Sequence, residues 1–165
     1  MPITLARAGA NRPAVPAAAR ARFVAYARRV LAREGVTRPD VGVVFADDAM
    51  LRALNAQYRG IDRATDVLSF TYADDGPGAP RRALAGELYL STARLAAQAR
   101  RYRHSPGAEL LRLVTHGLLH LCGHDHVKAG ERRVMRAAER AAMRADLGAG
   151  GAAAFEAVAK AALVP

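Results

Sequence analysis

Three histidines are the feature that most constrains what this chain can form. His116, His120 and His126 follow the spacing H-x3-H-x5-H. The first two are four residues apart and would share one face of a helix, and Gly123 can end that helix in a conformation that glycine tolerates. The chain can then reverse and bring His126 back to the pair. Three converging imidazoles suit zinc, and three protein ligands leave a fourth position for water or substrate, as in catalytic zinc sites.

The competing interpretation is a helix with incidental histidines. The chain contains five histidines, and four of them fall within residues 116–126. An i, i+4 pair followed by a third histidine beyond a glycine turn is a specific pattern for metal binding. The sequence therefore predicts one zinc ion per chain, bound by His116, His120 and His126.

The same positions match the H-E-x-x-H-x-x-G-x-x-H frame of the metzincin proteases, with one difference. The protease frame needs a glutamate directly after the first histidine, where it serves as general base. Gly117 occupies that position here and cannot accept a proton. The metal-binding residues are thus present without the peptidase base. A metallopeptidase remains an alternative in which another carboxylate acts as the base.

The histidine segment also carries a family resemblance. Residues 116–126, H-G-L-L-H-L-C-G-H-D-H, resemble the H-G-x-L-H-L-x-G-[YH]-D-H signature of the YbeY family of bacterial rRNA maturation factors. Residues 54–70 are similar to that family's L-N-x-x-Y-R and T-D-V-L-S-F motifs. Residues 85–88 resemble its G-D-I segment, with Glu87 where aspartate is commoner. The resemblance extends over about residues 40–147 in the family's order and spacing.

This resemblance implies a function. It implies a zinc-dependent endoribonuclease, specific for single-stranded RNA, that acts in maturation of the 3′ end of 16S rRNA and in ribosome quality control. The implied partners are ribosomal RNA and the small ribosomal subunit, together with a ribosomal protein and an assembly GTPase. Binding to DNA or to a membrane is not expected. A third interpretation, a noncatalytic ribosome-assembly factor whose metal only holds the fold, stays open.

Other residues near these motifs have expected roles. Arg59 ends the L-N-x-x-Y-R block, and the resemblance favours a catalytic role for it. A guanidinium group can bind two oxygens of the negatively charged phosphorane in phosphodiester cleavage, although an arginine at a helix end can also simply stabilise the helix dipole. Asp125 is expected either to orient an imidazole or to cap the turn. His124 is expected to contact a ligating imidazole or to lie on the surface. The general base stays open among Asp125, His124 and a metal-activated water.

Composition limits the partners and the location. The 165 residues carry a formal net charge of +10, which favours a polyanion such as RNA. Only two of the 25 basic residues are lysines, so nucleotide bias in the coding sequence competes with a designed RNA-binding surface. No apolar run approaches about 18 residues and no signal-peptide pattern begins the chain, so we expect no membrane span and a cytoplasmic location. A single cysteine, Cys122, fits a reducing compartment.

Hydrophobic periodicity and capping residues predict the secondary structure. Strands are expected at residues 3–5, 41–45, 65–70 and 83–90, and helices at 17–33, 48–58, 92–102, from 106 to the Gly123 turn, and 130–147. Residues 73–82 read as a loop because they are rich in turn-forming residues.

The order of these elements lacks regular βαβ alternation, which indicates an α+β fold. We expect a small mixed sheet of about four strands packed with helices, with the zinc site on a central helix and the turn that follows it. We expect a single domain from residue 1 to 150, followed by an alanine-rich tail at residues 151–165 that is either helical or frayed.

Overall fold

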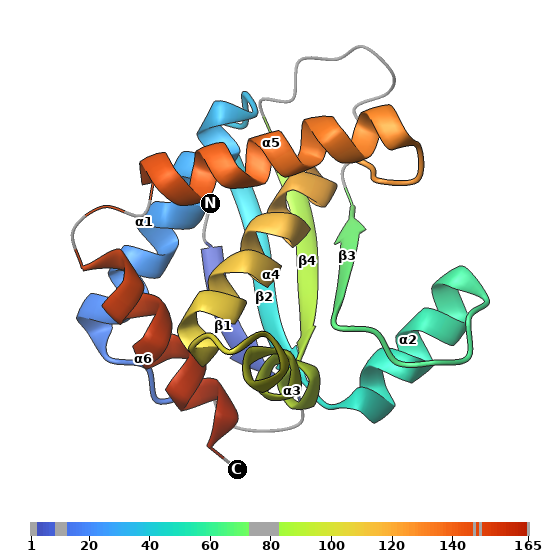
Figure 1. Cartoon of the computed structure of the whole chain (residues 1–165), viewed down its shortest axis with the longest axis horizontal. Helices are drawn as coiled ribbons and strands as arrows, with labels where there is room; N and C mark the ends of the chain where they lie inside the picture. Colours follow the sequence, from blue (N-terminus) through green and yellow to red (C-terminus); the bar gives the residue numbers. More distant parts are fainter. Residues whose placement is uncertain (1–2, 9–12, 73–82, 147, 149, 165) are drawn as a thin grey trace.

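The computed structural model describes residues 3–8, 13–72, 83–146, 148 and 150–164, so the predicted loop 73–82 lies outside the described residues. The strands are β1 (Ile3–Arg7), β2 (Arg38–Ala46), β3 (Val67–Thr71) and β4 (Ala83–Ser91). The helices are α1 (Ala17–Arg33), α2 (Asp48–Arg59), α3 (Thr92–Tyr102), α4 (Pro106–Leu121), α5 (Ala129–Asp146) and α6 (Gly151–Leu163). The predicted α+β class is confirmed (Figure 1). Among these described helices, none has the length and apolar character needed to cross a membrane.

The four strands form one mixed sheet in the order β1-β2-β4-β3. β1, β2 and β4 run parallel, whereas β3 is antiparallel to β4, with Val67 opposite Leu90 and Thr71 opposite Gly86. β3 is therefore an edge strand, and it contacts both α2 and α4. This places the end of the sheet between the two helices that carry the predicted site residues.

The two faces of the sheet pack against different helices. Leu84, Leu88 and Leu90 of β4 are buried in the main core, which α1, α4, α5 and α6 complete. On the opposite face, Leu68 of β3 packs in a smaller cluster with Leu51 of α2. Side chains alternate between faces along each strand, so both clusters follow from the alternating burial of the strand residues.

α4 is the central helix of the main core (Figure 1). It begins as predicted, because the Ser105 hydroxyl accepts a hydrogen bond from the backbone N–H of Ala108 at 3.1 Å and Pro106 occupies the first turn. A side chain at Gly117 would place its Cβ 2.9 Å from a methyl carbon of Leu88. Glycine here lets α4 lie close against β4. The helix ends before Gly123, whose φ of 85° starts the predicted turn.

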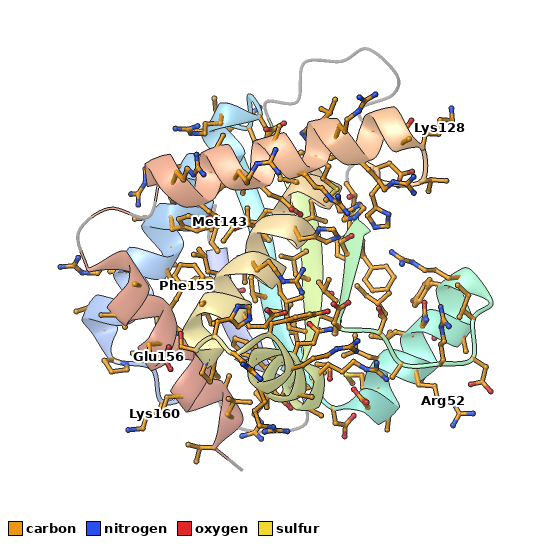
Figure 2. The ribbon with its side chains drawn as sticks, in the orientation of Figure 1. Arg52, Lys128, Met143, Phe155, Glu156 and Lys160 are labelled. Atoms are coloured by element: carbon orange, nitrogen blue, oxygen red, sulfur yellow. The ribbon has the colours of Figure 1, made fainter. Side chains whose placement is uncertain are left out.

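The C-terminal residues form α6, one of the two forms expected for them. Phe155 and Val158 are buried in the main core. α6 also lies against the start of α4, where a Cβ on Gly107 would be 2.6 Å from the Cα of Glu156. Figure 2 shows Phe155 and Glu156 on the side of α6 that faces α4. The division of the chain into a catalytic unit ending at residue 150 and a tail stays a prediction.

Candidate metal centre and catalytic site

The three predicted ligands converge in space. His116 and His120 lie in the last two turns of α4, and His126 follows the Gly123 turn. Their candidate ligand atoms all lie within 4.8 Å of one another. The His126 ring centroid is 5.5 Å from that of His116 and 4.9 Å from that of His120. Local helix geometry and one glycine turn are therefore enough to assemble the group.

The geometry of this histidine triad suits zinc. The Nε2 atoms of His116 and His120 are 3.1 Å apart. Two imidazole ligands of a tetrahedral zinc ion are separated by about 3.3 Å, given Zn–N bonds of about 2.0–2.1 Å. His116 and His120 are half-buried whereas His126 is exposed. The triad thus sits beside the core with one side open to solvent.

A carboxylate on another helix holds one of the three imidazoles. The Nδ1–H of His116 donates to Oε1 of Glu139 on α5 at 2.5 Å, and the two side chains are 22% and 18% exposed. A proton on Nδ1 leaves Nε2 with a free lone pair, the form that binds metal. Our sequence reasoning missed Glu139. The sequence pattern of α5 could have revealed it. Glu139 lies one turn from the buried Met135 and Ala142, so its carboxylate is at the border of the packing face.

His120 is held in its neutral form. Burial lowers the pKa of His120 to about 4, and the neighbouring His116, His126 and Arg59 shift it in the same direction. A neutral imidazole is the metal-binding form, since metals compete with protons for the same nitrogen. His120 is thus ready to bind a cation at neutral pH without first losing a proton.

Arg59 comes to the triad from the other side of β3. It is an exposed residue in the last turn of α2, which ends at Gly60 with a φ of 69°. The chain after this helix is fastened by the buried Asn55, whose Nδ2–H donates to the backbone carbonyl of Arg63 at 2.8 Å. The charge of Arg59 is close enough to lower the pKa of His120. The guanidinium charge of Arg59 therefore acts on the triad from a segment far away in the sequence.

Asp125 and His124 have contacts that separate their expected roles. Oδ1 of Asp125 accepts hydrogen bonds from the backbone N–H of His126 at 2.6 Å and of Val127 at 3.3 Å, so Asp125 caps the turn. The bond from His126 is the main cause of the lowered pKa of the Asp125 carboxyl. The Nε2–H of His124 donates to Oε2 of Glu34 at 2.8 Å, which ties the turn to the end of α1. His124 therefore contacts a carboxylate of α1 and not a ligating imidazole.

Comparison with known proteins gives the family. A family model described as endoribonuclease YbeY matches residues 12–146. The chain belongs to this family. It is 46% identical over 123 residues to the endoribonuclease YbeY of Roseiflexus sp. (strain RS-1), which covers 70% of this chain and 76% of that protein. It is 44% identical over 104 residues to the endoribonuclease YbeY of Desulforamulus reducens, covering 61% and 67% respectively. The resemblance found from the sequence motifs is confirmed.

The fold also has a counterpart among solved structures. The solution structure of a Thermotoga maritima protein matches with a TM-score of 0.58 and 24% sequence identity, over 88% of this chain and 89% of that one. At this identity the match supports the fold alone. A protein of this overall fold has therefore been determined experimentally.

Proposed function

We propose that this chain is a zinc-dependent endoribonuclease that cleaves single-stranded RNA in ribosomal RNA maturation, at the 3′ end of 16S rRNA, and in ribosome quality control. Membership of the endoribonuclease YbeY family supports RNA cleavage. The observation that carries the proposal is the three-histidine group, on which the guanidinium charge of Arg59 acts. A ribosomal protein and an assembly GTPase as partners, and a cytoplasmic location, stay predictions.

Zinc fits the residues that are present. The three imidazole nitrogens are the donor type that zinc prefers, and the 3.1 Å between the Nε2 atoms of His116 and His120 is close to the separation of two ligands on a tetrahedral zinc ion. His116, His120 and His126 would hold the ion, and Glu139 would keep the Nε2 of His116 unprotonated. When bound, zinc supplies Lewis-acid chemistry at a phosphate oxygen.

The role of Arg59 is to bind and stabilise charge. Its guanidinium group can donate two parallel hydrogen bonds to phosphate oxygens. Cleavage of a phosphodiester adds negative charge to those oxygens, so the same bonds strengthen in the transition state and lower the barrier. The exposure of Arg59 leaves its donors accessible to a substrate.

The contacts of His124 and Asp125 give both of them structural roles in the turn. The Nε2–H of His124 donates to Glu34, which ties the turn to the end of α1. Asp125 caps the turn, and its lowered pKa makes it a weak proton acceptor at neutral pH. We therefore base the proposal on metal binding and on charge stabilisation by Arg59.

The test is cleavage of an end-labelled single-stranded RNA by the zinc-loaded protein, beside a His120→Ala variant. The matched control is His124→Ala, which removes an imidazole from the same turn without touching the triad. We expect cleavage to disappear with His120→Ala and to persist with His124→Ala. Equal cleavage by all three proteins would indicate a contaminating nuclease and would refute the proposal. Cleavage of casein that a chelator abolishes would favour the peptidase instead.

A further inference from the structure

Basic side chains stand at every fourth position along the exposed surface of α5. The residues are Lys128, directly before the helix, and Arg132, Arg136, Arg140 and Arg144 within it. All five are exposed. Residues four apart are neighbours on a helix surface, about 6 Å apart along the axis and about 40° apart around it, so these residues follow a shallow spiral along α5. We call these five residues the basic row. Figure 2 labels Lys128 at the end of α5 where the row begins.

The charges of the basic row are not neutralised by the protein. Among the described residues, no carboxylate forms an ion pair with any member of the row, and the side-chain contact recorded for it joins Arg132 to the backbone carbonyl of Val127. Other arginines are paired, as Arg52 is with Asp62 and Arg112 with Glu109. Like charges four residues apart destabilise a helix. A bound polyanion would relieve this repulsion.

The basic row starts at the metal site. α5 begins three residues after His126, and its Glu139 accepts the hydrogen bond from His116. Arg136 is three residues before Glu139 and is therefore its neighbour on the helix surface. From Arg132 to Arg144 the row extends about 18 Å. A strand whose phosphate lies at the triad can thus continue along α5.

We propose that the basic row binds the phosphate backbone of single-stranded RNA on one side of the scissile bond. This inference rests on the proposed function. The regular spacing of the row suits an extended strand with repeating charges, and arginine forms paired hydrogen bonds with phosphate. Because the row contacts phosphates and not bases, it increases affinity for long RNA without selecting a sequence.

The test compares two variants that each lose four positive charges. The row variant is Arg132→Gln, Arg136→Gln, Arg140→Gln and Arg144→Gln. The matched control is Arg100→Gln, Arg101→Gln, Arg103→Gln and Lys160→Gln, which are exposed residues of α3, the turn after it and α6. α3 lies at the end of the molecule opposite α5, and Lys160 lies toward that same end of α6 (Figures 1 and 2). Glutamine has a helix propensity close to that of arginine, so we expect the circular dichroism spectra to match that of the wild type.

Binding is measured by fluorescence anisotropy with a 2′-O-methyl oligouridine of about 20 nucleotides, long enough for site and row together. A gel confirms that the probe stays intact. The slope of log Kd against log salt should fall by about 0.7 for each lost phosphate contact, hence by about 2 to 3 in the row variant and by less than about 1 in the control. A fourfold arginine-to-lysine variant of the row should keep the slope.

The outcomes separate this inference from the proposed function. Equal changes in the salt slope of the row variant and the control, or no change in either, would overturn the inference. If the wild type still cleaves RNA in that case, the proposed function is unaffected. A wild-type protein that neither binds nor cleaves RNA would overturn both. A substrate of about four nucleotides, too short to reach beyond the first part of the row, should be cleaved with equal kcat/KM by the wild type and the row variant.

Discussion

The contact between Glu139 and His116 predicts a measurable effect on zinc affinity. Glu139→Gln keeps the size of the side chain and a carbonyl acceptor but removes the negative charge. Both side chains are about four-fifths buried, and their heavy atoms are 2.5 Å apart, as expected for a charge-assisted hydrogen bond. Loss of a carboxylate that supports a ligating histidine costs about 10- to 100-fold in metal affinity, or about 1.4–2.7 kcal/mol. We expect Glu139→Gln near the lower limit and Glu139→Ala near the upper one.

The assay is a competitive zinc titration against a chromophoric chelator at neutral pH. The chain offers a matched control in Glu34→Gln, which removes a second carboxylate–imidazole contact, from Glu34 to His124, with similar exposure and a distance of 2.8 Å. That variant should bind zinc like the wild type, because His124 is outside the triad. If Glu139→Gln binds zinc within twofold of the wild type, or if Glu34→Gln loses as much affinity, then the carboxylate does not support the ligand as argued.

Three further predictions concern activity, pH and packing. Arg59→Ala should lower kcat by about 10²–10³-fold with zinc affinity unchanged, as for loss of one charge-stabilising donor. Arg63→Ala changes an exposed arginine four residues away and should keep a kcat near that of the wild type. Equal kcat values for the two variants would show that Arg59 is not catalytic. In zinc-free protein, His120 should titrate near pH 4 in an NMR experiment. Its contribution to the stability of the fold should therefore be complete above its ordinary pKa of 6.5 and be lost as the pH falls from 6.5 toward 4. Titration near pH 6.5 would contradict the buried environment. Gly86→Ala should destabilise the fold by about 1–3 kcal/mol in urea unfolding, because the new Cβ would lie 2.6 Å from the carbonyl oxygen of Phe70. A urea midpoint equal to that of the wild type would show that β3 and β4 move apart at little cost.

Local sequence signals predicted the elements and the convergence of the three histidines well. Ser105 and Pro106 specify the start of α4, and Gly123 specifies its turn, because capping and positive φ depend on the residue itself. His116 and His120 meet because helix geometry alone places them together. These features need no knowledge of the rest of the chain.

Contacts between distant segments could not be predicted in the same way. Glu139 reaches His116 because α5 folds back over the end of α4, and Glu34 reaches His124 because α1 ends near the same turn. Each pairing depends on how helices pack, which the sequence of either segment does not encode. For Asp125 the sequence left two roles open, orienting an imidazole or capping the turn. Its hydrogen bond from the backbone N–H of His126 shows that it caps the turn.

The proposed metal ligands and Arg59 come from separate parts of the fold. All three histidines and Glu139 lie on α4, its following turn and α5, whereas Arg59 arrives on α2 from the far side of β3. Loosening of α2 or of the β3 edge would therefore remove the cationic partner and leave the zinc ligands together. A preparation could contain one zinc ion per chain and still be inactive. Zinc content then shows only that α4, the turn after it and α5 are folded. RNA cleavage is needed to show that α2 holds Arg59 in place as well.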